Sequence, residues 1–220
     1  MTQTNDRCQR PTLPLLLTTL VALLVAQAPP VFAQNGETAS AYETSYKREA
    51  DGKYRQALDA LEKASASERT RYIYLLRKGW LLYNSGEYAN AIDAYRKAAE
   101  AEPKAVEPLA GLMLPQMALR RWKDATQTAQ KALRLDPNNY LAKSRYAWAL
   151  YNLGRFSESE QRYREVLALY PSDADMRSGL GWALLKQGKS EVARKQFERV
   201  LEFAPEHASA TEGLRQAGGS

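Results

Sequence analysis

The chain has 220 residues and a formal net charge of +6, and it contains one cysteine and one histidine. These two residues, Cys8 and His207, are too few to supply a typical zinc site. No glycine-rich phosphate loop or nucleophile elbow follows a predicted strand. Close carboxylates such as Glu158 and Glu160 lie two apart on a predicted helix and point in different directions. We therefore predict a protein that is not an enzyme, with no catalytic residues, no metal and no other cofactor.

Residues 1–33 have the pattern of a cleavable secretory signal peptide. A run of apolar and neutral residues extends from Leu15 to Ala26, and small residues further on predict cleavage before Gln34. At about 1.5 Å per residue the run reaches only about 18 Å, short of the roughly 30 Å that a spanning helix must cross. We expect a periplasmic or secreted bacterial protein with no transmembrane span after cleavage. A retained membrane anchor is the alternative.

From Thr38 to His207 the sequence repeats itself every 34 residues without insertion or deletion. The most regular mark is a glycine, replaced by arginine in the third unit, at positions Gly52, Gly86, Arg120, Gly154 and Gly188. Proline follows seventeen residues later in four units, at Pro103, Pro137, Pro171 and Pro205. Five units at a fixed register indicate stacked copies of one supersecondary structure.

The residues on either side of each glycine predict two helices. In the second unit Tyr88, Ala91, Ile92 and Tyr95 have the spacing of one helical face, and residues 75–83 form an apolar helix before the glycine. Glycine supplies the conformation of a tight turn, and proline ends the second helix because it cannot continue the hydrogen-bond ladder. Each unit is therefore predicted to be a helical hairpin that buries its apolar face by stacking on the next.

This pattern resembles the tetratricopeptide repeat family over all five units. The resemblance implies an all-α fold, a right-handed superhelical solenoid of five helical hairpins plus a short C-terminal capping helix. The expected division is a leader at 1–33, a repeat domain at 34–207 with repeats 38–71, 72–105, 106–139, 140–173 and 174–207, and a partial capping helix with a flexible C-terminus at 208–220. Asn139 and Asp173 are expected to cap the helices that follow them, and His207 is expected to be a loop or cap residue.

The resemblance also implies that the first helix of each hairpin lines a concave groove. The family's groove positions give the candidate partner-binding residues Tyr42, Tyr46, Ile73, Leu76, Trp80, Tyr83, Asn84, Leu114, Met117, Trp148, Tyr151, Asn152, Trp182 and Leu185. Large aromatic rings dominate binding hot spots, so this row suits an apolar peptide or an amphipathic helix of a protein partner. The alternative is that the rings fill the seams between repeats. Some family members grip a terminal carboxylate with Lys, Arg and Asn, but here those positions are mostly apolar or hydroxyl-bearing.

The third unit departs from the others in its first helix and in its turn. Pro115 lies inside the predicted helix, where it removes a hydrogen bond and is expected to kink the helix and free the Gly111 carbonyl. The kink would shape a pocket around Leu114 and Met117, or it is drift tolerated in an exposed helix. Met113 stands where the other units have Ser45, Gly79, Ala147 and Gly181. The turn carries the cluster Arg120, Arg121 and Lys123, a charged turn or a docking patch for an acidic partner or lipid headgroup.

These features predict a non-catalytic protein–protein interaction scaffold or adaptor in the bacterial cell envelope. The resemblance to exported repeat proteins suggests a secretion, polysaccharide-export or maturation assembly. We expect no binding to nucleic acid by an exported protein. Two alternatives remain: a structural protein that self-assembles into a homo-oligomer, and a carbohydrate-binding module that uses the same rings.

Overall fold

The structure is a computed structural model that describes residues 31–218 of the chain. Residues 1–30 of the expected leader lie outside this range, and its last three residues begin the first helix. Throughout the described range the regular structure is helical, and no strand is found there. The elements are α1 Val31–Ala50, α2 Tyr54–Leu61, the 3-10 turn η1 Glu68–Thr70, α3 Tyr72–Asn84, α4 Tyr88–Ala101, α5 Glu107–Ala118, α6 Trp122–Leu135, α7 Tyr140–Asn152, α8 Phe156–Leu169, α9 Ala174–Leu185, α10 Ser190–Phe203 and α11 Ala208–Gly218.

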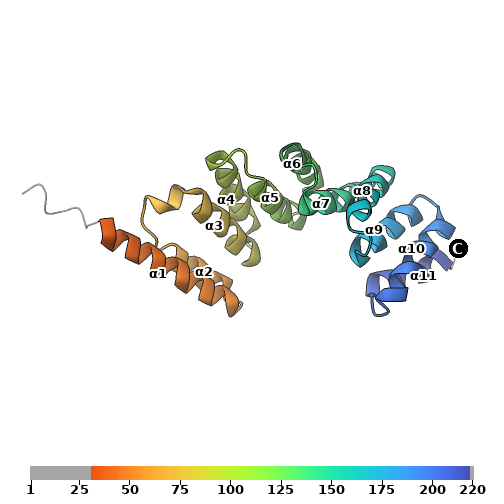
Figure 1. The fold of residues 1–220 in the computed structure, drawn as a ribbon, viewed down its shortest axis with the longest axis horizontal. Helices are drawn as coiled ribbons and strands as arrows, with labels where there is room; N and C mark the ends of the chain where they lie inside the picture. Colours follow the sequence, from red (N-terminus) through yellow and green to blue (C-terminus); the bar gives the residue numbers. More distant parts are fainter. Residues whose placement is uncertain (1–30, 219–220) are drawn as a thin grey trace, which may run out of the picture.

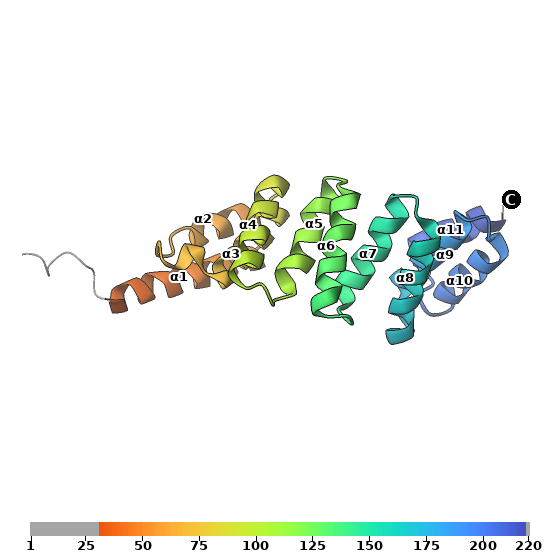
Figure 2. The ribbon, with the colours of Figure 1, turned by 90° about the horizontal axis from the view of Figure 1, so that it is seen from above.

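The helices pair in chain order into five hairpins, and α11 packs on the last of them. Figure 1 shows the hairpins following one another along the long axis of the molecule, with α1 and α11 at opposite ends. The same order is visible from above in Figure 2. The prediction of five hairpins with a helix after them is therefore confirmed. The first helices α3, α5, α7 and α9 contact one another in turn, and Arg77 of α3 bonds to Ser45 of α1, so the first helices lie side by side along the array.

The turns inside the hairpins explain the glycine period. Gly86 has a φ of 78°, and its amide donates to the Tyr83 carbonyl at 3.0 Å, which closes the turn between α3 and α4. Three further hairpin glycines have the same left-handed conformation. Arg120 takes it too, with a φ of 56°, and its amide makes the matching bond to Met117 at 2.9 Å. A residue with a Cβ pays about 1–2 kcal/mol for this conformation, so the third turn is strained relative to the others.

Aromatic rings on the second helices hold neighbouring first helices apart at a fixed distance. The Tyr95 ring of α4 lies against Gly79 of α3 and Gly111 of α5, where no side chain larger than hydrogen fits. The Phe197 ring of α10 is held in the same way between Gly181 and Gly213. These seams are buried and set the spacing of the first helices that form the candidate site.

Side-chain caps begin the later helices, as the sequence predicted. The Asn139 side chain accepts from the Ala142 amide at 3.0 Å, and Asp173 accepts from Met176 at 3.0 Å. His207 holds the same register position and accepts from the Ala210 amide through Nδ1 at 3.2 Å. Each cap satisfies one of the free amides at a helix start.

The second helix of the first hairpin is short: α2 has only 8 residues, whereas the second helices of later units have 14. Arg69, which stands where later units have proline, donates to the carbonyls of Glu62 and Ala64 just beyond the end of α2. The shortened helix leaves a cavity of about 680 Å³ between α2, α3 and α4, and the cations and carboxylates on its wall include the pairs Arg55–Glu87 and Lys78–Glu62. The charges of those four side chains are therefore balanced within the chain.

Pro115 does not end α5, which is helical from Glu107 to Ala118. The proline is buried, and so is Met113, which packs with Ala129 and Leu150 of the following helices. Pro115 has no amide to donate to the Gly111 carbonyl, yet the helix continues past it because its neighbours hold it by packing. The third unit thus keeps the hairpin architecture.

Candidate functional site: a groove lined by the first helices

The first helices of the first four hairpins enclose a groove of about 370 Å³. Its lining residues come from α1, α3, α5 and α7, with one ring from α4 and one cap residue: Tyr46, Ile73, Leu76, Arg77, Trp80, Tyr95, Glu107, Ala110, Gly111, Leu114, Asn139, Leu141 and Arg145. We call this set the groove. Five of the fourteen residues singled out in the sequence line it, namely Tyr46, Ile73, Leu76, Trp80 and Leu114.

The three tryptophans at one repeat position have different surroundings. Trp80 and Trp148 are exposed to 39% and 45%, and the Trp80 indole donates to Glu49 at 2.5 Å. Trp182 is half-buried: its ring packs edge-on against Phe197 at 5.5 Å, and its indole donates to Ser209 of α11 at 2.9 Å. The seam interpretation therefore describes Trp182, whereas Trp80 and Trp148 keep exposed faces.

The repeated Tyr–Asn pairs support these tryptophans. Tyr151 stacks on Trp148 with ring centroids 5.7 Å apart and planes 9° apart, and burial raises the pKa of its hydroxyl. Asn152 donates to the Trp148 carbonyl at 2.9 Å. In the second unit Tyr83 lies 6.2 Å from the Trp80 ring, and Asn84 donates to the Trp80 carbonyl at 2.8 Å. The pairs thus fix the rings and helix ends behind the exposed tryptophans.

The remaining candidates are packing residues. The Tyr42 hydroxyl donates to Glu68 at 3.0 Å, and burial together with this bond raises the pKa of the hydroxyl. Met117 packs against the cluster around Met113, and Leu185 packs against the core of the last hairpin. These three side chains hold the scaffold together.

Two arginines in the groove were missed in the sequence, although they are 68 residues apart and so share one repeat position. Arg77 is buried and fully partnered. It donates to the Ser45 hydroxyl at 3.1 and 2.8 Å and to Glu49 at 2.8 Å, and its guanidinium lies 3.5 Å from the centre of the Tyr46 ring. Glu49 therefore joins Arg77 and Trp80 in one polar cluster at the amino-terminal end of the groove.

Arg145 lacks such a cluster. Its Nη1 donates to the Ala110 carbonyl at 2.6 Å, and among residues 31–218 no carboxylate lies within the 4.0 Å of an ion pair. Burial lowers the pKa of its guanidinium. At the positions that hold Ser45 and Glu49 in the first unit, the third unit has Met113 and Met117. A comparison of the arginine position with the facing carboxylate position of the preceding unit would have revealed that Arg145 lacks an ionic partner.

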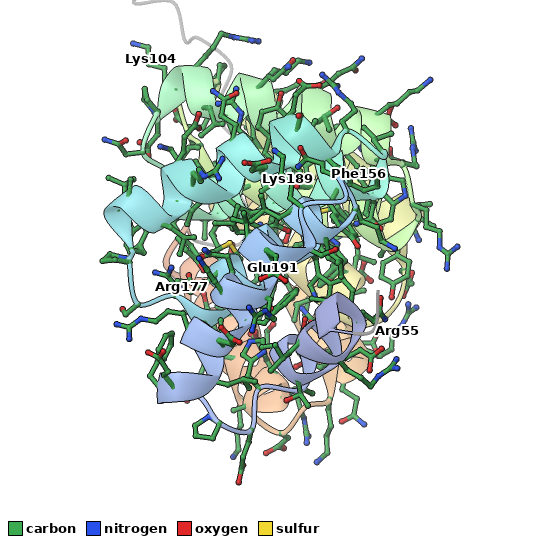
Figure 3. The ribbon with its side chains drawn as sticks, turned by 90° about the vertical axis from the view of Figure 1, so that its right-hand side faces the viewer. Arg55, Lys104, Phe156, Arg177, Lys189 and Glu191 are labelled. Carbon is green, nitrogen blue, oxygen red and sulfur yellow. The ribbon has the colours of Figure 1, made fainter. Side chains whose placement is uncertain are left out.

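A second polar cluster lies outside the groove, where α8 meets the α9–α10 turn. The buried carboxylate of Glu160 accepts from Lys189 at 2.9 Å and from Gln187 at 2.7 Å, and it pairs with Arg164. Gln187 also donates to the Phe156 carbonyl at 3.3 Å. Figure 3 labels Phe156 and Lys189 on the two segments that this cluster joins. All its charges are satisfied within the chain, so it stabilises the seam.

Within residues 31–218 no three His, Cys, Asp or Glu side chains are grouped to hold a metal ion. None of the helices in that range is both long and apolar enough to cross a membrane.

Stacked helical hairpins with left-handed turns and a groove along their first helices define a helical-repeat scaffold. The chain belongs to the tetratricopeptide repeat family, which it matches over residues 42–106 and 178–214 and, by a second pattern of that family, over residues 116–164. Proteins of this family mediate protein–protein interaction and are generally non-catalytic.

Similar proteins agree with this assignment. The photosystem I assembly protein Ycf3 of Synechococcus elongatus is 24% identical over 144 residues, covering 56% of this chain and 81% of that protein. The solved structure of MamA from Desulfovibrio magneticus RS-1, residues 41 to the end, has a TM-score of 0.72 at 16% identity, covering 78% of this chain and 97% of that one. YrrB, described as having an unusual peptide-binding site, has a TM-score of 0.69 at 19% identity, covering 84% and 95%. At these identities the structural likeness shows the fold.

Proposed function

We propose that this chain is a non-catalytic scaffold that binds an apolar peptide or an amphipathic helix of a partner protein in the groove. One observation carries the proposal: large apolar side chains that line the groove on α3 and α7 remain exposed. Ile73 is exposed to 61%, Leu141 to 45% and Trp80 to 39%. Burying apolar surface gains about 25 cal/mol per Å², so a partner segment that covers these side chains gains binding free energy.

The rigidity of the groove supports the same proposal. Trp80 is hydrogen-bonded to Glu49, and the Arg77 guanidinium lies over the Tyr46 ring, so these two groove rings are already ordered before a partner arrives. An ordered ring loses little side-chain entropy on binding, which leaves more of the burial free energy for affinity. The groove crosses four first helices, a surface that suits an extended segment or one helix.

We further propose that the scaffold works in the bacterial cell envelope, in a secretion, polysaccharide-export or maturation assembly. The leader pattern of residues 1–33 supports export. The named role of the relative Ycf3 in assembly supports a part in building a complex. Cell fractionation with amino-terminal sequencing tests the location: the proposal expects an envelope protein that begins at Gln34, and a cytoplasmic protein that retains its leader would overturn it.

The groove is tested by crosslinking and affinity capture with Trp80→Ala and a control of similar exposure, Phe203→Ala. Trp80 lines the groove and is 39% exposed, whereas Phe203 is 45% exposed and lies at the end of α10, outside the groove. We expect Trp80→Ala to lose a specific partner while its circular dichroism stays unchanged, and Phe203→Ala to retain that partner. Equal capture by both variants would contradict the proposal. A mass that rises with concentration would favour self-assembly, and quenching of tryptophan fluorescence by soluble glycans would favour carbohydrate binding.

A further inference from the structure

Two arginines at one repeat position differ in a way that points to the chemistry of the partner. Arg77 has a carboxylate, a hydroxyl and an aromatic ring around its guanidinium, all from the preceding hairpin. Arg145 faces the preceding hairpin at the same place, where methionines replace the carboxylate and the hydroxyl. Its single bonded partner is the neutral Ala110 carbonyl, so the positive charge is uncompensated within the described chain.

An unpaired charge held away from water costs free energy, and an incoming opposite charge recovers part of that cost. Glu107 also lines the groove, yet it lies beyond ion-pair distance of Arg145 and instead accepts a bond from the Tyr72 hydroxyl at 3.4 Å. Glu107 is exposed, so water solvates its carboxylate. Arg145 is therefore the one groove cation, among the described residues, that is left for a partner to neutralise.

We propose that the groove recognises a segment in which an Asp or Glu side chain lies between apolar residues, and that Arg145 binds this carboxylate. The inference rests on the proposed function of the groove. Along α7, Leu141 precedes Arg145 by one turn and Trp148 follows it by about one turn, and both are exposed. A segment that continues past the arginine in both directions covers both apolar side chains.

Two other anionic ligands fit less well. A chain terminus at Arg145 would leave either Leu141 or Trp148 uncovered. A doubly charged phosphate would meet one cation and the nearby negative charge of Glu107. A single carboxylate side chain matches the one free guanidinium, which can bind both of its oxygens.

The test uses the purified protein and a random twelve-residue peptide library displayed as an internal loop, so that no probe has a free carboxyl end. An enriched peptide is then synthesised with blocked ends in a Glu form and a Gln form, and binding is measured by calorimetry. We expect the protein to bind the Glu form roughly ten-fold more tightly. Arg145→Met should abolish this preference, and Arg96→Met, which alters an exposed arginine of α4, should keep it.

The outcomes separate this inference from the function on which it rests. Enrichment of apolar peptides without acidic residues, or a Glu preference that survives Arg145→Met, overturns the inference and leaves the groove function standing. Peptide binding that Trp80→Ala does not weaken overturns both. Should Arg145→Met lose helical circular dichroism, Arg145→Gln replaces it, because its amide still offers a donor to the Ala110 carbonyl.

Discussion

The carboxyl-terminal end of the groove, on α7, and the surface of α9 beyond it are built from the same repeat positions, yet their side chains have opposite surroundings. On α9, Trp182 is covered by α11 and hydrogen-bonded to Ser209. On α7, Trp148 is exposed and Arg145 lacks an ionic partner. The difference comes from what packs on each helix next, because α11 covers α9 whereas the hairpins beside α7 leave that surface open. Repeat position thus fixes where a side chain lies, and its neighbours decide whether it remains free to bind.

The largest expected difference in stability is between substitutions of Arg77 and Arg145. Arg77→Met leaves Glu49 and Ser45 without their buried partner and should lower the free energy of unfolding by about 3–5 kcal/mol. Arg145→Met removes an unpaired charge and should change it by less than about 1 kcal/mol. Urea denaturation followed by circular dichroism measures both. Equal losses would mean that Arg145 is as well satisfied as Arg77.

The next largest difference in stability is expected between substitutions of Trp182 and Trp148. Trp182→Ala removes a ring that packs against Phe197 and should cost roughly 2–3 kcal/mol of stability, somewhat below the value for a fully buried ring. Trp148→Ala should cost about 1 kcal/mol, because much of that ring is already in water. Thermal denaturation of the two variants side by side checks the order. A larger loss for Trp148 would assign it to packing.

The carboxylate cluster of the carboxyl-terminal half should respond to acid. Burial acts to raise the pKa of Glu160, but hydrogen bonds from Lys189 and Gln187 and the charge of Arg164 outweigh it, so the pKa is lowered. Its stabilisation is therefore full above the unfolded value of about 4.3 and is lost as the pH falls through the lower folded value. Glu160→Gln should cost about 1–2 kcal/mol at pH 7. The stabilities of the variant and the parent should converge as the pH falls through the lowered folded pKa, and a constant difference would exclude an ionic contribution.

The smallest effect concerns the turn that leads out of the middle helix, α5. Arg120→Gly should raise the free energy of unfolding by about 0.5–1 kcal/mol. Glycine relieves the left-handed strain, but it also increases the conformational entropy of the unfolded chain, which offsets part of the gain. The reverse change at the equivalent position, Gly154→Arg, should lower stability by a similar amount. Melting temperatures of both variants test the pair. If Arg120→Gly also weakens partner capture, the Arg120, Arg121 and Lys123 cluster is a docking patch.

The sequence predicted the architecture well because the hairpin depends on local chemistry. Gly86 forms a left-handed turn and Asn139 caps a helix start whatever packs around them, so each role is predicted from a single sequence position. The short α2 was not predicted, because only the loss of proline at Arg69 marks it. The burial of Trp182 and the lack of an ionic partner for Arg145 depend on residues of other units, such as Ser209 of α11 and Met117 of α5. A repeat pattern that is compared one position at a time does not show which side chains of other units cover or pair with a given residue.

The aromatic rings between neighbouring units affect which parts of the array unfold together. Tyr95, Tyr163 and Phe197 hold one repeat position and wedge between helices of neighbouring units. In the third unit that position is Ala129, and Met113 packs there together with Tyr146 and Leu150. A joint filled in part by a flexible thioether yields more easily than one filled by a wedged ring. Amide hydrogen exchange should therefore resolve two cooperative blocks that meet at this joint, and the groove would widen or narrow as one block pivots on the other.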